Sequence, residues 1–275
     1  RKQAIDKRLV ALWGLGGMGK TQTALAFAHI HKNDYDSVLW LTGDSISGFE
    51  QSLFELARPL ISAGLLQRTL LDQYEPAAVR QTVVDYLRQS NTYLLICDNV
   101  DSPLSIRDVW PRNLAGHVLF TSRSHDIRRL GAVVVDLDHL SEEESQDYLT
   151  CCRAASDSGE EQAVRTLVGE LQGLPLALAQ AAAYVSRHKS RYDTYLRGYR
   201  KKKLGLLEQG LPDEDYPYSV ATTWAMSIEQ VERNNPASLA LLKLCSLLQP
   251  DAIPEEMFCG VADELDEPLR SIFRE

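Results

Sequence analysis

The sequence of 275 residues lacks the features that would place it in or across a membrane. No apolar run reaches the roughly 18 residues that a membrane-spanning helix needs. The first residues, Arg1-Lys2-Gln3-Ala4, are not followed by the apolar core of a signal peptide. The five cysteines form no Cys-x-x-Cys pair, which favours reduced thiols over disulfides or a thiolate metal site. We therefore expect a cytoplasmic protein with no membrane span.

Positive charge is also scarce, with 29 Lys and Arg against 38 Asp and Glu and a net charge of −9 at pH 7. Because sequence-independent binding to nucleic acid depends on neutralising phosphates, this balance predicts no nucleic-acid partner. The one basic run, Arg200 to Lys203, is interpreted as a solvated helix face, with a polybasic patch as the alternative. The hydrophobic fraction of 44% is enough for a real core and for one large domain or two smaller ones.

Short apolar runs alternate with helical patterns in the first half of the chain. Helical spacing at 20–31 and within 49–89 predicts helices, the second interrupted near Pro59 and Gly64 and restarted at Pro76. This alternation is typical of a parallel sheet with helices on both faces. The apolar runs that predict buried strands are 8–13, 37–41, 93–97, 117–121 and 133–137.

The pattern changes after His139. Ser141 and Glu144 have the spacing of a helix capping box, and from there to about Glu208 the sequence predicts only helices. The segment 209–217, rich in Gly, Pro and acids, is the best linker candidate. Helical segments are predicted near 219–233 and 236–248. Residues 271–275 fall within an element, so we expect the chain to be part of a longer protein.

A complete phosphate-binding pattern, Gly-x-x-x-x-Gly-Lys-Thr, follows the first predicted strand at 14–21. Its glycines let successive backbone N–H groups face one anion, and the helix that follows adds the positive end of its dipole. Lys20 is predicted to reach the β- and γ-phosphates, and the Thr21 hydroxyl to bind Mg²⁺. The predicted nucleotide-binding residues here are Gly14, Gly16, Gly17, Met18, Gly19, Lys20, Thr21 and Gln22.

Polar residues at the ends of two other predicted strands extend this site. Asp98 ends the third strand and is predicted to hold Mg²⁺, mostly through water. Many hydrolysing proteins with this loop carry a second acid at the next position, but here it is Asn99, whose amide cannot accept a proton from water. Asp101, two residues further on, could substitute as the base, although an extra residue shifts the reach of a side chain by several ångströms. Arg123 leaves the fourth strand and is predicted to hydrogen-bond the γ-phosphate.

Four motifs in a fixed order resemble one family, the NB-ARC module of NOD-like immune receptors and apoptotic ATPases, within the STAND class of P-loop NTPases. The first motif, at 14–21, is shared by many ATPases and GTPases, so it is the fourth, at 173–178, that makes the resemblance specific to this family. The segments 224–227 and 241–258 are similar to fungal members of this class. The motifs are Gly-Leu-Gly-Gly-Met-Gly-Lys-Thr (14–21), Leu-Leu-Ile-Cys-Asp-Asn-Val-Asp (94–101), Val-Leu-Phe-Thr-Ser-Arg (118–123) and Gly-Leu-Pro-Leu-Ala-Leu (173–178).

The resemblance implies an α/β P-loop NTPase domain at 1–140, with a five-stranded parallel sheet flanked by helices. A small helical domain at 141–210 and the start of a winged-helix domain at 218–275 would follow. In the family, the proline of Gly-Leu-Pro contacts the nucleotide, which assigns Pro175, with Leu176 beside it, to the nucleotide site. The implied cofactors are ADP or ATP, with Mg²⁺.

Three features depart from the family pattern. The Met-His-Asp motif at the end of the family's winged helix does not occur in this sequence. The segment before the first strand, which usually helps to hold adenine, is reduced to Arg1–Lys7. Asn99 replaces the second acid, which is consistent with slow hydrolysis.

The function that the resemblance implies is a regulatory switch in innate immune signalling, with at most slow hydrolysis by Asp98, Asn99 and Arg123. ADP would hold a closed form, and ATP would favour an open form that self-associates in the full-length protein. The main alternative is an active AAA+-type ATPase that remodels DNA or protein, which Asn99 and the acidic charge disfavour. A small-molecule kinase is weaker still, because we find no acceptor site. The guanine-reading pattern Asn-Lys-x-Asp is absent, which favours adenine.

Overall fold

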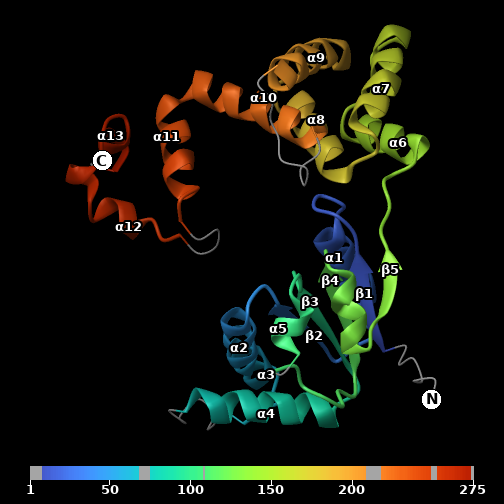
Figure 1. Cartoon of the computed structure of the whole chain (residues 1–275), viewed down its shortest axis with the longest axis vertical. Helices are drawn as coiled ribbons and strands as arrows, with labels where there is room; N and C mark the ends of the chain where they lie inside the picture. The colour runs from blue at the N-terminus through green and yellow to red at the C-terminus, as the bar shows by residue number, and fades with distance from the viewer. Residues whose placement is uncertain (1–7, 68–74, 108, 209–217, 249–252, 274–275) are drawn as a thin grey trace. The chain divides into compact units, whose positions relative to one another are not determined.

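The computed structural model describes residues 8–67, 75–107, 109–208, 218–248 and 253–273. Their contacts divide the chain into two compact units, Arg1–His139 and Leu140–Glu275. The described elements of the first unit are strands and helices, and those of the second are helices alone (Figure 1). The predicted linker at 209–217 lies outside the described residues, and the predicted boundaries of three domains stay predictions.

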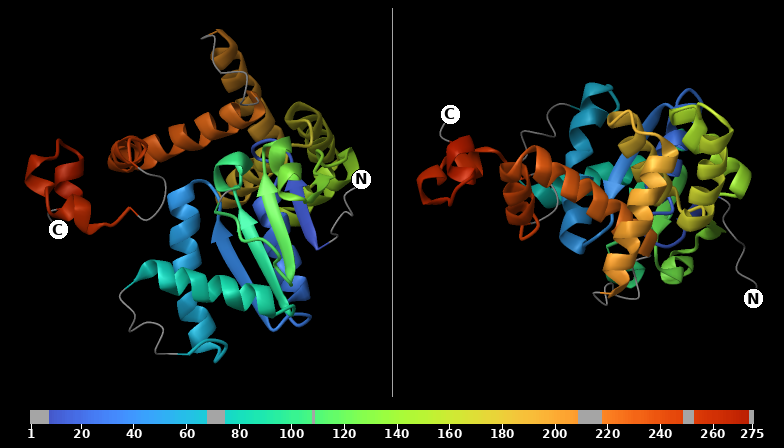
Figure 2. Two further views of the ribbon diagram at one scale, coloured as in Figure 1. Left: turned by 60° about the horizontal axis from the view of Figure 1, so that its bottom comes forward. Right: turned by 90° about the horizontal axis from the view of Figure 1, so that it is seen from above.

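The first unit is built on a five-stranded parallel sheet in the order β2-β3-β4-β1-β5. The strands lie side by side in Figure 2, and every pairing is parallel. This confirms the predicted fold class, with each strand end within one residue of its prediction. The strands are β1 (Leu9–Trp13), β2 (Ser37–Thr42), β3 (Tyr93–Asp98), β4 (His117–Ser122) and β5 (Val133–Asp136).

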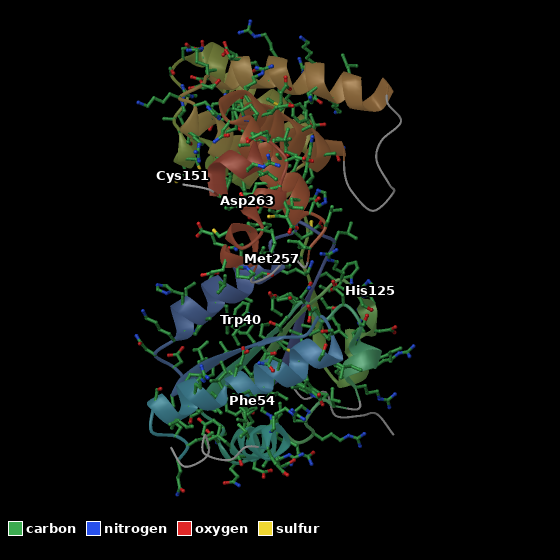
Figure 3. All side chains as sticks on the ribbon, turned by 90° about the vertical axis from the view of Figure 1, so that its left-hand side faces the viewer. Trp40, Phe54, His125, Cys151, Met257 and Asp263 are labelled. Carbon is green, nitrogen blue, oxygen red and sulfur yellow. The ribbon has the colours of Figure 1, made fainter. Side chains whose placement is uncertain are left out.

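Alternate strand residues face opposite sides of the sheet, so two hydrophobic clusters form. One contains Leu95 and the buried residues of α2 (Ile46–Glu55), α3 (Ala57–Ser62) and α4 (Pro76–Gln89). The other contains Leu94 and two buried alanines of α1 (Lys20–His31). Phe54 packs against the first cluster and Trp40 against the second, and both are labelled in Figure 3. Helices therefore cover both faces, as predicted.

Two short elements of the first unit were not predicted. They are α5 (Pro103–Ile106) and the 3₁₀ helix η2 (His125–Leu130). Each is too short to show a helical period in the sequence. The element η2 begins soon after β4 and carries His125, whose stacking on Trp13 is described below.

The second unit begins at the predicted capping box. The Ser141 hydroxyl accepts the backbone N–H of Glu144, and the Glu144 carboxylate accepts the backbone N–H of Ser141. No strand occurs among its described residues, so the start of a winged helix is not confirmed. The helices are α6 (Glu142–Cys152), α7 (Ser158–Leu171), α8 (Pro175–Arg187), α9 (Tyr192–Glu208), α10 (Tyr218–Asn234), α11 (Pro236–Cys245), α12 (Glu256–Cys259), η3 (Ala262–Glu264) and α13 (Leu269–Phe273).

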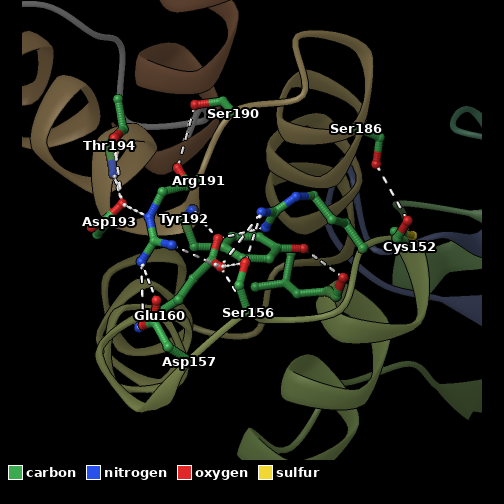
Figure 4. A network of polar contacts seen from close by, with 12 residues as sticks. Cys152, Ser156, Asp157, Glu160, Ser186, Ser190, Arg191, Tyr192, Asp193 and Thr194 are labelled. Carbon is green, nitrogen blue, oxygen red and sulfur yellow. Dashed lines mark hydrogen bonds and ion pairs between the residues drawn. The ribbon is translucent and has the colours of Figure 1, made fainter.

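A buried carboxylate joins the ends of several helices in this unit (Figure 4). The Glu160 side chain is 0% exposed, and its oxygens accept from the Arg153 guanidinium, from the backbone and hydroxyl of Ser156, and from the backbone N–H of Tyr192. Burial alone would raise the pKa of Glu160, but these hydrogen bonds outweigh it and lower the pKa to about 2. The network therefore depends on an ionised Glu160.

The basic run at 200–203 does not form one free patch. Arg200 and Lys203 both pair with Glu170 of α7, at 3.2 and 2.8 Å, whereas Lys202 pairs with Glu229 of α10 at 3.1 Å. Three of the four cations are thus tied to neighbouring helices on two sides of α9. Across the residues that the structure describes, no helix is both long and apolar enough to cross a membrane.

Candidate nucleotide-binding site

The phosphate loop connects β1 to α1 through backbone positions that require glycine. Gly17 and Gly19 have φ values of 82° and 80°, in the left-handed region that side chains disfavour. A Cβ atom at Gly14 would lie 3.2 Å from the carbonyl oxygen of Leu137, so the strand end is also close-packed. The loop therefore curls back and leads into the N-terminus of α1, where backbone N–H groups and the helix dipole favour an anion.

Lys20, the first residue of α1, lies folded over this loop. Its Nζ donates to the carbonyl oxygens of Gly14 and Leu15, both at 2.8 Å, which leaves one of the three ammonium protons for a ligand. Burial lowers the pKa of Lys20, and the nearby charge of Arg123 lowers it further. Two cations therefore share one neighbourhood, as a site for phosphates requires.

Three oxygen-bearing side chains meet beside the loop. The carboxylate Oδ1 of Asp98 accepts the Thr21 hydroxyl at 2.9 Å and the Thr121 hydroxyl at 2.6 Å. Asp98 and Thr121 meet because β3 and β4 pair in parallel and end side by side, and Thr21 reaches Asp98 from the first turn of α1. A hydroxyl and a carboxylate at this distance fit Mg²⁺, which takes few protein ligands and completes its octahedron with water and phosphate oxygens.

Asn99 follows Asp98 in a backbone conformation that few residues adopt. Its φ is 62°, and asparagine tolerates this left-handed region better than most side chains. Its backbone N–H donates to the Thr121 hydroxyl at 2.8 Å, and its side chain is exposed. The turn therefore gives a conformational reason for asparagine at this position, alongside the predicted role at the attacking water.

Arg123 lies against the phosphate loop and is held by Asp101. A Cβ atom at Gly16 would be 3.9 Å from both Cζ and Nη1 of the Arg123 guanidinium. The Asp101 carboxylate accepts the backbone N–H of Arg123 at 2.7 Å and pairs with its Nε at 3.3 Å. Because both carboxylate oxygens are engaged, the geometry weighs against Asp101 as a substitute base.

Aromatic residues support the same arginine from the other side. The indole Nε1 of Trp13 donates to the carbonyl oxygen of Arg123 at 2.9 Å. The Trp13 ring stacks on the His125 ring, with centroids 3.7 Å apart and an interplanar angle of 24°. Sequence reasoning missed these contacts and the role of Thr121. The role of Thr121 could have been suspected only from its place in the motif at 118–123, two residues before Arg123.

The remaining predicted site residues lie in the loop or in the second unit. Met18 is buried within the loop, and Gln22 is exposed on α1. Pro175 and Leu176 begin α8, where proline suits the first helical turn. The preceding Gly173 has a φ of 68°, and its Cβ would lie 2.1 Å from the Leu140 carbonyl oxygen, so glycine is required there. The predicted contact of Pro175 with the nucleotide stays a prediction.

A parallel five-stranded sheet with a glycine-rich loop between β1 and α1 defines the fold as that of a P-loop NTPase. Within this class, the chain belongs to the NB-ARC domain family, whose match covers residues 1–158. This confirms the resemblance found in the sequence motifs, and membership of the family implies nucleotide binding.

Individual relatives agree with this assignment. A nucleotide-binding leucine-rich repeat (NLR)-like protein of Hyaloscypha variabilis is 28% identical over an alignment 282 positions long, which covers 90% of this chain and 28% of that protein. The regulatory protein AfsR of Streptomyces griseus is 30% identical over 186 residues, 66% of this chain and 18% of its own length. The chain thus spans less than a third of either protein, and it is an NB-ARC module like those of NLR-like proteins.

A solved structure shares the fold. The STAND protein with a tetratricopeptide repeat sensor from Pyrococcus horikoshii superposes with a TM-score of 0.56 at 17% identity. The superposition covers 96% of this chain and 36% of that protein. At this identity the likeness shows the fold alone.

Proposed function

We propose that this chain is an ATP- and ADP-binding regulatory switch, whose nucleotide state controls self-association of the full-length protein in the cytoplasm. The observation that carries the proposal is the Arg123 guanidinium beside Gly16 of the phosphate loop. An arginine there can meet a γ-phosphate, which only ATP has, so the two nucleotides would make unequal contacts. Unequal contacts are what a ligand needs in order to shift a conformational equilibrium.

The groups around the loop support binding of a nucleotide with Mg²⁺. Lys20 keeps a proton available for a phosphate, and Thr21 with Asp98 would hold the metal ion. Held by these two residues, the metal ion would offset the negative charge of the phosphates. Pro175 and Leu176, at the start of α8, would contact the nucleotide from the second unit, as the family resemblance implies.

Slow or absent hydrolysis is part of this proposal. Asn99 occupies the position of a second acid, and Asp101 is engaged with Arg123. A neutral amide cannot accept the proton of the attacking water. The same features weigh against the alternative of an active AAA+-type ATPase. A role in innate immune signalling is supported by the NLR-like fungal relative and by the disease resistance protein RRS1B of Arabidopsis thaliana, 24% identical over 192 residues.

Replacing the arginine tests the proposal directly. Arg123→Ala should weaken binding of a non-hydrolysable ATP analogue by about ten- to a hundredfold, the cost of losing a hydrogen bond between charged groups. Affinity for ADP should change by less than about twofold, because ADP has no phosphate at that position. Isothermal titration calorimetry with both nucleotides and Mg²⁺ measures the two affinities.

Arg129 provides a matched control for this variant. Its side chain is 59% exposed, against 60% for Arg123, and it pairs with Asp126 as Arg123 pairs with Asp101. Arg129→Ala should therefore leave both affinities unchanged. Equal weakening of ATP analogue and ADP by Arg123→Ala would show that the arginine supports the fold or the β-phosphate, and would refute the switch mechanism as stated.

A further inference from the structure

Asp101 both neutralises the charge of Arg123 and fixes the orientation of its guanidinium group. We propose that Asp101 is a positioning residue that sets the preference for ATP over ADP, by holding the Arg123 guanidinium with its terminal nitrogens toward the phosphate loop. This inference rests on the proposed function, because it takes Arg123 as the group that meets the γ-phosphate.

The two carboxylate oxygens of Asp101 hold different parts of Arg123. Oδ1 accepts the backbone N–H at 2.7 Å, and Oδ2 lies 3.3 Å from Nε. Arginine carries five N–H donors in a rigid plane, one on Nε and four on the terminal nitrogens. Engaging Nε fixes that plane and leaves the terminal nitrogens, one of which, Nη1, lies 3.9 Å from a Cβ placed at Gly16, the same distance as Cζ. The free end of the fork therefore faces the loop.

The backbone on both sides of this pair is also fixed. The Trp13 indole donates to the Arg123 carbonyl oxygen at 2.9 Å, and the Ser122 hydroxyl donates to the carbonyl oxygen of Val100 at 2.5 Å. Val100, which precedes Asp101, is fully buried. Asp101 therefore follows a buried residue whose backbone is hydrogen-bonded to the end of β4, and the orientation that it gives to Arg123 is defined before a nucleotide binds.

The pair contributes little to folding. The side chains of Arg123 and Asp101 are 60% and 33% exposed, and exposed ion pairs have small effects on stability. The energetic value of holding Arg123 lies instead in binding, since a flexible arginine must otherwise be immobilised when it meets a phosphate. Substitution of Asp101 should thus change nucleotide preference while leaving the fold intact.

If Asp101 acted only through its charge, its removal would change the affinity for ATP in the opposite direction. The Asp101 carboxylate repels phosphates, so removing its charge would strengthen nucleotide binding, and most of all for ATP with its additional charge. The positioning role predicts that the same change weakens ATP. The ratio of the two affinities therefore distinguishes the two effects.

Asp101→Asn is the sharpest variant, because its Oδ1 can still accept the backbone N–H of Arg123. It places a neutral group opposite Nε and removes the ion pair. The affinity for a non-hydrolysable ATP analogue, relative to ADP, should fall by about 2- to 12-fold, the effect of leaving one long side chain to be ordered on binding. The thermal midpoint of the nucleotide-free chain should stay the same. Asp126→Asn, which breaks the exposed pair with Arg129, is the control and should change neither quantity.

The double variant Arg123→Ala, Asp101→Asn completes a cycle measured by calorimetry. In the absence of the Arg123 side chain, Asp101→Asn should no longer lower the affinity for the ATP analogue relative to ADP. A ratio that rises or stays constant in the single variant overturns the positioning role. If Arg123→Ala itself leaves the ratio unchanged, the proposed function fails instead, so the two failures are distinguishable.

Discussion

Each unit contains a cluster of charged residues, and the two clusters differ in burial and in how fully their charges are paired. In the second unit, Glu160 is 0% exposed and its oxygens accept hydrogen bonds from several groups at once. In the first unit, the guanidinium of Arg123 is 60% exposed and Lys20 keeps a proton beyond its two bonds to loop carbonyls. A buried charge whose hydrogen-bonding groups are all paired holds helices together. Charges that keep unpaired hydrogen-bond donors favour the binding of a ligand.

The two clusters also differ in how the chain builds them. Glu160 finds its partners within the stretch from Arg153 to Tyr192, at the end of α6, at the start of α7 and at the start of α9 (Figure 4). The site residues instead come from the start of α1 and from the ends of β3 and β4, and Thr21 and Asp98 are 77 positions apart. Local packing therefore produces the scaffold cluster, whereas the sheet topology produces the site.

The comparison predicts its largest effect at Glu160. Glu160→Ala should lower the free energy of unfolding of the second unit by about 3–5 kcal/mol, because Arg153 loses its buried partner. Urea denaturation followed by circular dichroism measures this loss. The adjacent Glu161 is exposed, so Glu161→Ala should cost less than about 1 kcal/mol, through the helix dipole alone. Similar losses for both variants would contradict the scaffold role of Glu160.

Acid should remove the same stabilisation from the unmodified chain. The pKa of Glu160 falls from an ordinary 4.5 to about 2 on folding. Its contribution is therefore complete above pH 4.5 and is lost as the pH falls towards about 2. If Glu160 is responsible, the Glu160→Ala variant should lose less stability than the unmodified chain over this range.

The next largest effect is expected at Lys20, in the charged cluster around the phosphate loop. Lys20→Ala should weaken ADP binding by about 1.5–3 kcal/mol or more, the value of a charge-assisted contact to phosphate. Lys32 at the C-terminal end of the same helix is exposed, and Lys32→Ala should have no effect on ADP affinity. Calorimetry that gives an unchanged ADP affinity for Lys20→Ala would remove the assignment of the phosphate loop.

The smallest effect is expected at Asn99. If the water is already oriented, Asn99→Asp should raise the single-turnover hydrolysis rate by at least about tenfold, a partial share of what a general base provides. Aspartate also tolerates the left-handed backbone, so the turn should survive. Asn113 is exposed and has a φ of 61°, close to the 62° of Asn99, which makes Asn113→Asp the matched control. An unchanged rate would place Asn99 away from the water.

Much of the fold could be predicted from the sequence, because buried strands are continuous apolar runs. The run at 93–97 predicted β3 to within one residue, since no other element buries both faces over so short a length. The capping box at Ser141 was equally clear, because its residue types and spacing are local. The single turns α5 and η2 were missed, since they have no period of their own.

The site could be predicted only in part. The phosphate loop, Asp98 and Arg123 were found because each stands at the end of a recognisable strand. The hydrogen bond from Thr121 to Asp98 depends on the pairing of β3 with β4. The order of strands in a sheet cannot be predicted from any single segment of the sequence. The pair between Asp101 and Arg123 was missed for the same reason, and Asp101 was considered as a base instead.

The strand order has a consequence for the synthesis of this chain. The phosphate loop is made first, but β1 pairs with β4 and β5, and β4 is also the strand that joins β1 to β3. Until β4 leaves the ribosome, the loop and Asp98 stand on strands that have no contact through the sheet. Such long-range pairing is slow to form. A nascent chain should therefore acquire affinity for nucleotide only after β4 has been made, when ATP or ADP in the cell can begin to stabilise the sheet.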